Sequence, residues 1–332
     1  MSIEQARQGP NKQENSFKEQ FAKLETIETA GGTAEVVDIA PAQSKDEGPV
    51  LFAPAWACTL PVYKPALETL VNEGRRVLSL NHPRRGGEMK LTYAEKELVK
   101  EYPNEEVRKA LTLRDILNKK GVGKVDVIAH SEGAVNAAIA ALLNPEKFRN
   151  IVFFGPAGLI GGDNAIRLFK GFAAQGNPKP SLKEIPVGEQ QKKATQAEGR
   201  TAIEYPEIPT TETAKQVGAT AGREALKYMG QNPFRAIKEG WGLSKVQIDS
   251  LIDKLHERGI GIVVISAVDD PVFPTKTMAE RLKKGSLDGF LSVRGGHGQI
   301  GEHPEHYMAM ANQMLEKLRD RGRQPTINTS DE

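Results

Sequence analysis

Cysteine is almost missing from this chain. Its 332 residues include a single cysteine, Cys58, so no disulfide can form within the chain. Such scarcity is typical of proteins from a reducing compartment, and we expect this one to lie in the cytoplasm. Cys58 is better interpreted as a small hydrophobic side chain than as a nucleophile, because free cysteines are most often buried for packing.

Long apolar runs and an excess of charge are missing as well. No segment reaches the ~18 apolar residues of a membrane span, and residues 1–23 lack the apolar centre of a signal peptide. We therefore expect no stable membrane anchor. Lysine and arginine number 45 against 43 aspartates and glutamates, a net charge of +2 that gives no reason to expect a nucleic-acid partner.

Apolar residues make up 39% of the chain, enough for a large core, and many stand in short continuous runs. Such runs are typical of strands buried on both faces of a parallel sheet. Segments with helical spacing separate them, and this alternation predicts an α/β fold with a doubly wound, mostly parallel sheet. The runs are 50–53, 77–80, 125–129, 151–154, 260–265 and 289–293, and the helical segments are 61–72, 105–119, 134–143, 246–257, 275–284 and 304–318.

Two regions depart from this alternation. Residues 25–29 and 34–39 flank a Gly31-Gly32 turn and predict an antiparallel hairpin ahead of the parallel strands. Residues 158–240 contain helical pieces and several prolines but no strand pattern, so we interpret them as a mostly helical insertion over one end of the sheet. The predicted organisation is a polar leader (1–23), an α/β core (24–157 and 241–318) interrupted by the insertion (158–240), and a polar tail (319–332).

Ser131 stands in a distinctive local pattern. The apolar run 125–129 ends just before it, and a helical segment follows at once. Ala129 and Gly133, two residues to either side, are both small, as a sharp strand–turn–helix connection requires. Such a nucleophile elbow exposes the serine hydroxyl at a helix N-terminus, where a developing negative charge is favoured. The pattern predicts that Ser131 is a catalytic nucleophile.

A serine hydroxyl needs a neighbouring base, and that base needs a third group to orient it. Asp270 follows the predicted strand 260–265, and His297 follows the next predicted strand in a glycine-rich loop. The carboxyl ends of parallel strands border the crevice in which such sheets bind ligands. We expect Asp270 and His297 to meet Ser131 there, with Asp269 as the less favoured alternative for the acid.

The order Ser131, Asp270, His297 resembles that of nucleophile, acid and base in the α/β-hydrolase fold family. Three segments add to the likeness, namely the acid loop 270–274, the histidine loop 296–297 and a turn at 81–87. The resemblance spans roughly residues 50–318, and the insertion falls where members carry a cap. It implies a serine hydrolase in which His297 activates Ser131 and Asp270 orients His297.

The resemblance also implies the rest of the site. The backbone N–H groups of Trp56 and Glu132 would form the oxyanion hole, and Ala55 and His130 would line the substrate site. One departure lies next to the first of these donors, where Pro54-Ala55 replaces the His-Gly that members often carry.

The reaction implied is hydrolysis of a small-molecule ester or acyl substrate through an acyl-enzyme, without a cofactor. The same triad serves C–C bond hydrolases, lactonases, thioesterases, amidases and cofactor-free haloperoxidases, which stay open as alternatives. A non-catalytic binding protein with this fold is the alternative from another class. The sequence leaves the oligomeric state open.

Two other patterns are weaker as sites. His303 and His306 stand beside Glu302, but no further ligand group is placed with them, so we expect no metal and interpret them as the start of a helix. Residues 296–301 match the glycine spacing of a dinucleotide fingerprint. No βαβ unit follows them, which argues against a nucleotide cofactor.

Overall fold

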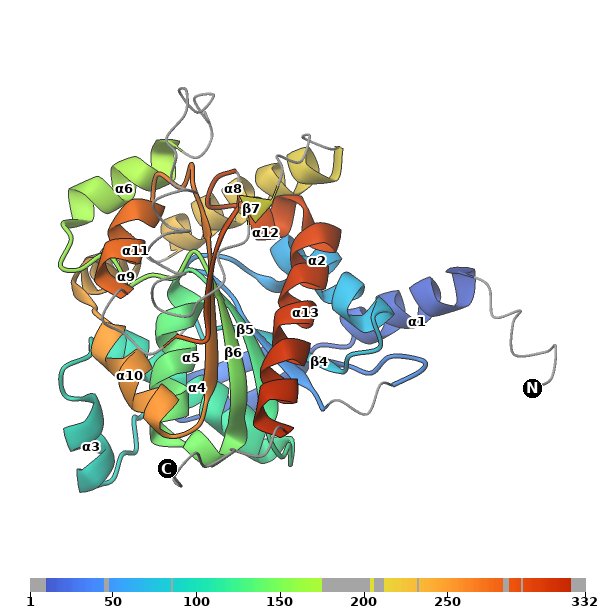
Figure 1. The fold of residues 1–332 in the computed structure, drawn as a ribbon, viewed down its shortest axis with the longest axis horizontal. Coiled ribbons are helices and arrows are strands. Elements are labelled where there is room, and N and C mark those ends of the chain that lie inside the picture. The colour runs from blue at the N-terminus through green and yellow to red at the C-terminus, as the bar shows by residue number, and fades with distance from the viewer. Residues whose placement is uncertain are drawn as a thin grey trace, which may run out of the picture.

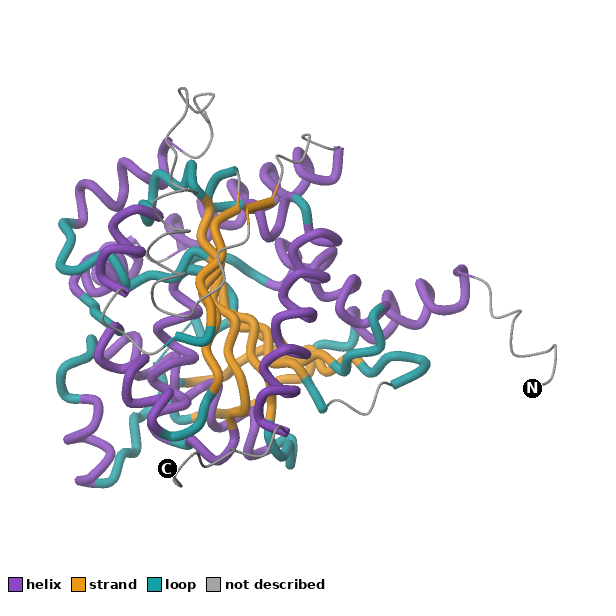
Figure 2. Tube along the Cα trace, viewed as in Figure 1, coloured by secondary structure: helices purple, strands orange, loops and turns teal. Residues whose placement is uncertain are grey.

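The computed structural model describes residues 10–44, 48–84, 86–174, 204–205, 212–231, 233–282, 287–293 and 295–323. The middle of the predicted insertion, the start of the predicted leader and most of the predicted tail lie outside these ranges. The described residues form one sheet between two layers of helices (Figure 1, Figure 2).

The described part of the sheet has nine strands, β1 (Glu25–Thr29), β2 (Gly32–Ile39), β3 (Val50–Ala53), β4 (Val77–Asn81), β5 (Val125–His130), β6 (Phe148–Phe154), β7 (Glu204–Tyr205), β8 (Gly261–Ala267) and β9 (Gly289–Val293). Their spatial order is β1-β2-β4-β3-β5-β6-β8-β9-β7. β1 and β2 form the predicted hairpin, β2 also runs antiparallel to β4, and the other pairs are parallel. The predicted fold class is confirmed.

Strand β7 corrects one expectation, because the insertion was predicted to contain no strand. It pairs in parallel with β9 at one edge of the sheet. Two residues are too few to show the alternation by which a strand is recognised in a sequence.

Helices cover both faces of the sheet and one end of it (Figure 1). One face carries α1 (Pro10–Ala22), α2 (Leu60–Asn72) and α13 (Pro304–Arg323), and the other carries α4 (Asn104–Lys119), α5 (Glu132–Leu143) and α10 (Asp249–Glu257). The cap helices, as we name them, lie over the end of the sheet and are α6 (Ala165–Ala174), α8 (Glu212–Gln231) and α9 (Pro233–Lys245). The shorter helices are α3 (Tyr93–Val99), α11 (Thr275–Leu282), α12 (Gln299–Glu302) and a 3₁₀ turn at Pro145–Lys147.

The sheet has a separate apolar core on each face. Along β5, Val127 and Ala129 belong to one core and Ile128 to the other, as the period of two in a strand requires. At the amino end of β5, Asp126 forms a buried ion pair with Arg75 at 2.8 Å. The carboxyl end of the same strand leads directly into Ser131.

Helix α3 was not predicted, although its start carries a recognisable signal. Thr92 Oγ accepts a hydrogen bond from the Glu95 N–H at 3.2 Å, and the Glu95 carboxylate accepts one from the Thr92 N–H at 2.7 Å. This capping box satisfies two backbone donors at the helix start. Only Val99 of the helix is buried, so no apolar stripe marks it in the sequence. At the other end of the chain, α13 runs to Arg323, past its predicted end at Leu318.

Candidate active site

Ser131 occupies the sharp turn between β5 and α5. Its backbone has φ 56° and ψ −119°, a conformation that residues other than glycine rarely adopt. The Ser131 N–H donates to the Phe154 carbonyl at 2.9 Å, and the Ser131 carbonyl accepts from the Ala157 N–H at 3.1 Å. A Cβ at Gly133 would lie only 2.3 Å from the Ala53 carbonyl oxygen, so the turn demands glycine there.

Asp270 lies in the loop after β8, with both carboxylate oxygens engaged. Its Oδ1 accepts the backbone N–H groups of Val272 at 2.7 Å and Phe273 at 2.9 Å. Its Oδ2 lies 2.7 Å from Nδ1 of His297. Asp269, the neighbouring carboxylate, is linked instead through its backbone N–H to the Gly295 carbonyl. The carboxylate turned toward the histidine is therefore that of Asp270.

His297 is held in one tautomer by this contact. Because the ionised carboxylate can only accept, Nδ1 must carry the proton and Nε2 presents a lone pair. Nε2 of His297 and Oγ of Ser131 are both buried, and neither has a hydrogen-bond partner among the described residues. Gly155 packs against the contact between His297 and Asp270, since a Cβ there would lie 3.1 Å from Nδ1 of His297 and 3.2 Å from Oδ2 of Asp270.

His130 belongs to a directed chain of hydrogen bonds. The Ala55 N–H donates to the Tyr63 hydroxyl at 3.1 Å, which lies 2.7 Å from Nδ1 of His130. Nε2 of His130 lies 2.9 Å from the His297 carbonyl oxygen and must be the donor, so Nδ1 accepts from Tyr63. Burial and then the nearby His297 ring lower the pKa of His130 to about 3. Both ring nitrogens therefore bond to the protein, and neither is free for a substrate.

The two positions expected to form an oxyanion hole lie in different segments of the chain. Trp56 follows β3, and Glu132 begins α5, so its N–H lies at a helix N-terminus. The backbone N–H groups of both residues donate no hydrogen bond to any described group. Unengaged donors of this kind are what an oxyanion hole presents before substrate arrives.

Aromatic side chains of the cap helices cover the site. The Trp56 ring contacts Phe172 at 5.5 Å, Phe169 at 5.9 Å and Tyr228 at 6.4 Å between ring centroids. Phe172 also lies 6.1 Å from the His297 ring, and Ser131 is only 1% exposed. The described side chains above the reacting groups are aromatic, and Ser131 itself is buried.

Helix α6 is tied directly to the loop that carries Asp270. Arg167 donates to the Val272 carbonyl at 2.7 Å and to the Pro271 carbonyl at 3.4 Å. A Cβ at Gly171 would lie 2.6 Å from the Pro271 carbonyl oxygen, so glycine allows this close approach. The loop of Asp270 and the cap thus share an interface.

A group of buried charged residues, not predicted from the sequence, lies beside Trp56 and includes Glu132. It comprises Glu106, Lys109, Glu132 and Glu239, each at most 3% exposed. Glu106 and Lys109 stand three apart on α4, and Glu239 stands four residues after Arg235 on α9. Such spacings are ordinary on exposed helix faces, so only the structure shows that these residues are buried together.

Cys58 lies beside Tyr63 and is partly buried. Burial, opposed by a hydrogen bond with Tyr63, raises the pKa of the Cys58 thiol to about 11, so it is protonated and a poor nucleophile. In the part of the chain that the structure describes, no three histidine, cysteine, aspartate or glutamate side chains are arranged to hold a metal ion. No described helix is long and apolar enough to cross a membrane.

Known protein families and solved structures include matches to this chain. The family model of the alpha/beta hydrolase fold matches residues 48–304. A search of the curated proteins finds no match. Among solved structures, the chain resembles a thermophilic esterase from Thermogutta terrifontis, with 16% identity, a TM-score of 0.57, and coverage of 89% of this chain and 99% of that one.

Two further structures show the same fold. The esterase EaEST from Exiguobacterium antarcticum is 14% identical, with a TM-score of 0.58 and coverage of 88% of this chain and 98% of that one. A bromoperoxidase from Bacillus anthracis is also 14% identical, with a TM-score of 0.57 and coverage of 89% and 100%. Identities this low show a shared fold and leave the chemistry to the site.

Proposed function

The chain belongs to the α/β-hydrolase fold family, and we propose that it is a serine hydrolase that cleaves small carboxylic esters through an acyl-enzyme on Ser131. The observation that carries the proposal is the 2.7 Å contact between Asp270 Oδ2 and His297 Nδ1. It leaves Nε2 of His297 as the acceptor that a serine hydroxyl needs. Esterases with this fold from two other organisms add support.

The reaction would proceed in two stages, acylation and then deacylation of Ser131. His297 Nε2 takes the proton from Ser131 Oγ while Oγ bonds to the ester carbonyl carbon. The tetrahedral intermediate then expels the alcohol, which receives that proton from Nε2. Water repeats the sequence on the acyl-enzyme, giving up its proton to Nε2 and releasing the acid with the Ser131 hydroxyl restored. Asp270 stays ionised throughout and stabilises the imidazolium.

The oxyanion of each intermediate would be bound by the backbone N–H groups of Trp56 and Glu132. Trp56 lies in the loop after β3 and Glu132 is the first residue of α5, so these donors need little rearrangement as the charge develops. Loss of one such donor typically costs about 100-fold or more in rate. The acyl group would lie against the aromatic side chains of the cap helices, which favours an apolar acyl chain.

A fluorophosphonate probe tests the nucleophile. We expect it to label the wild type and the control Ser250→Ala, which removes an exposed hydroxyl on α10, and not to label Ser131→Ala. Equal labelling of Ser131→Ala would overturn the assignment of the nucleophile to Ser131. No labelling of the wild type would overturn the proposal and leave a non-catalytic binding protein.

A series of p-nitrophenyl esters of rising chain length tests the substrate class. We expect turnover with kcat/KM that depends on chain length, because the aromatic cover limits the acyl site. Labelling without turnover of any ester would contradict ester hydrolysis. The same serine would then be tested on amides, lactones, thioesters and C–C substrates, and for cofactor-free haloperoxidase activity.

A further inference from the structure

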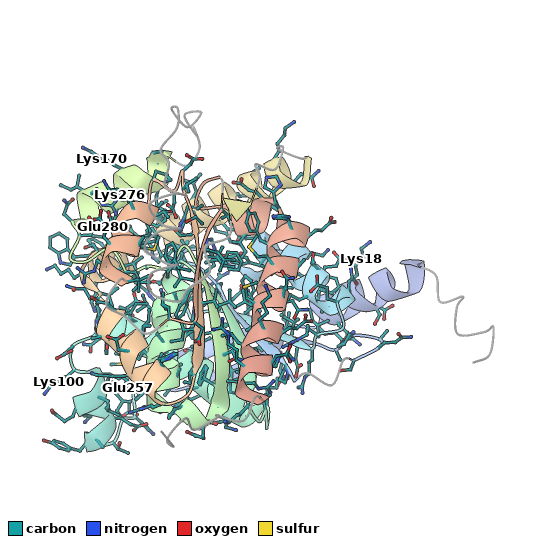
Figure 3. The ribbon with its side chains drawn as sticks, in the orientation of Figure 1. Lys18, Lys100, Lys170, Glu257, Lys276 and Glu280 are labelled. Carbon is teal, nitrogen blue, oxygen red and sulfur yellow. The ribbon has the colours of Figure 1, made fainter. Side chains whose placement is uncertain are left out.

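Buried charges lie directly beside the two oxyanion positions, where a protein of this size would ordinarily place apolar side chains. Most charged residues lie outside, as Figure 3 shows for the labelled Lys18, Lys100, Lys170, Glu257, Lys276 and Glu280. Glu106, Glu132 and Glu239 are instead 0% exposed, and Lys109 is 3% exposed. Burying a charge is strongly unfavourable unless the charge is well paired.

These charges join the side chains of Trp56 and Glu132 into one continuous path. The Trp56 indole Nε1–H donates to Oε2 of Glu239 at 3.0 Å. Lys109 Nζ lies 3.5 Å from the same oxygen and 2.6 Å from Oε1 of Glu132. The two residues whose backbone N–H groups would bind the oxyanion are thus connected through Lys109 and Glu239.

Glu239 is the centre of the path and comes from the cap. Its Oε2 also accepts from the Tyr228 hydroxyl of α8, and its Oε1 accepts from Nε of Arg235 at 2.8 Å. Burial acts to raise the pKa of Glu239, but Lys109, Tyr228 and Arg235 together lower it to about 2. The carboxylate is therefore ionised at any pH at which the enzyme would work.

Glu106 is a further buried carboxyl group beside Glu132. Burial and then the neighbouring Glu132 raise the pKa of Glu106 well above its usual value. Neither of its carboxyl oxygens has a hydrogen-bond partner among the described residues. Lys109 lies against the carboxyl groups of Glu132 and Glu239, and Arg235 lies against that of Glu239.

We propose that Glu239 is a positioning residue for the oxyanion hole. With α9 packed against the core, it holds Trp56 directly and Glu132 through Lys109. The inference rests on the proposed function, in which the N–H groups of Trp56 and Glu132 bind the oxyanion. A buried ion pair is often no more stabilising than apolar residues of the same volume. Its placement at both donors therefore points to geometry rather than to stability.

Two conservative variants test the proposal. Trp56→Phe keeps an aromatic ring and removes the indole donor, and Glu239→Gln keeps the shape but turns an amide donor toward groups that already donate. We expect each to lower kcat about 10- to 100-fold, as for a misplacement near 1 Å, with KM changed less than about threefold. A trifluoromethyl ketone, which forms a tetrahedral oxyanion on the serine, should bind more weakly by the same factor.

The double variant separates positioning from a structural role. If both residues act on one oxyanion hole, their effects should not multiply. The kcat of Trp56→Phe/Glu239→Gln should then be at most about threefold lower than the kcat of the less active single variant. The control is Asp126→Asn, which breaks the buried pair with Arg75 at the opposite end of β5. It should lower the thermal midpoint at least as much as Glu239→Gln and leave kcat per titrated active site unchanged.

The possible failures are distinguishable. Wild-type turnover with an unchanged kcat in both single variants would overturn the positioning role and leave the hydrolase intact. So would multiplicative effects in the double variant, or an equal loss of kcat in Asp126→Asn. A wild type that neither turns over esters nor reacts with the fluorophosphonate would overturn the hydrolase and this role with it.

Discussion

His297 and Asp270 meet at a single hydrogen bond, 2.7 Å between Nδ1 and Oδ2, and the other carboxylate oxygen is already used. Oδ1 of Asp270 accepts two backbone N–H groups, those of Val272 and Phe273. The carboxylate therefore cannot rotate without losing three bonds. Its orientation fixes which nitrogen of His297 holds the proton.

Asp270→Asn should abolish most activity by reversing that tautomer. The asparagine oxygen would be held by the N–H groups of Val272 and Phe273, so the amide NH₂ would face Nδ1 of His297. Nδ1 must then accept, and the ring proton moves to Nε2, where it cannot receive the serine proton. We expect kcat to fall about 10⁴-fold at neutral pH, measured with a p-nitrophenyl ester.

Asp269→Asn is the matched control for this change. It alters the carboxylate next to Asp270. Asp269 donates its backbone N–H to the Gly295 carbonyl, whereas the contact with His297 is made by the side chain of Asp270. We expect its kcat to stay within about twofold of the wild type, as is usual for a loop carboxylate outside the reacting groups. Equal losses in the two variants would contradict the assignment of the acid to Asp270.

Gly133→Ala should destabilise the protein strongly through the backbone of β3. The new Cβ would lie 2.3 Å from the Ala53 carbonyl oxygen and 2.7 Å from that of Pro54, and neither can move without disturbing the strand. We expect a loss of about 3 kcal/mol in the free energy of unfolding, measured by urea titration. Gly123→Ala, where no atom lies within 4 Å of the new Cβ, should change it by less than about 0.5 kcal/mol.

The sheet could be predicted from the sequence because its strands are buried on both faces. β3 reads as a continuous apolar run and β5 as an apolar run interrupted by Asp126, and the connecting helices carry regular apolar spacing. The two-residue β7 and the largely exposed α3 could not be found in this way, since neither buries enough side chains to leave a pattern. Burial, more than propensity, decided which elements were visible.

The three candidate catalytic residues could be predicted for a similar reason, because each follows a strand end that the sheet brings to one edge. The chain from Ala55 through Tyr63 to His130 could not, since Tyr63 reads simply as an apolar position of α2. Glu239 was hidden as well. Its partners Trp56 and Lys109 lie far from it in the chain, and only the packing of α9 against the core brings them together.

Histidine burial should make stability depend on pH. Burial and then Lys109 lower the pKa of His82 to about 3, while the unfolded chain titrates near 6.5. Between those values the unfolded state binds a proton that the folded state does not, so this group favours unfolding as the pH falls below 6.5. At pH 5 the loss from His82 alone should be about 2 kcal/mol relative to pH 7.5.

The variant His82→Gln isolates this effect by difference. Glu106, whose pKa is raised, contributes with the opposite sign, and it contributes to both proteins. We expect the free energy of unfolding of the wild type, minus that of the variant, to fall by about 2 kcal/mol from pH 7.5 to pH 5 in urea titrations. Curves that stay parallel over that range would show that His82 is protonated in the folded protein.

Backbone strain at the turn of Ser131 should be measurable once the hydroxyl is removed. At φ 56° an alanine keeps the unfavourable contact of Cβ with the backbone, whereas glycine has no Cβ and adopts this conformation freely. The greater entropy of glycine in the unfolded chain offsets part of that gain. We expect Ser131→Gly to be about 1 kcal/mol more stable than Ser131→Ala in urea titrations, with both inactive. At Ser16, inside helix α1, the order should reverse because glycine lowers helix stability there by about 1 kcal/mol. A Ser131→Ala variant as stable as Ser131→Gly would mean that the turn relaxes when the side chain changes, and that the strain is not built into the strand and helix that flank it.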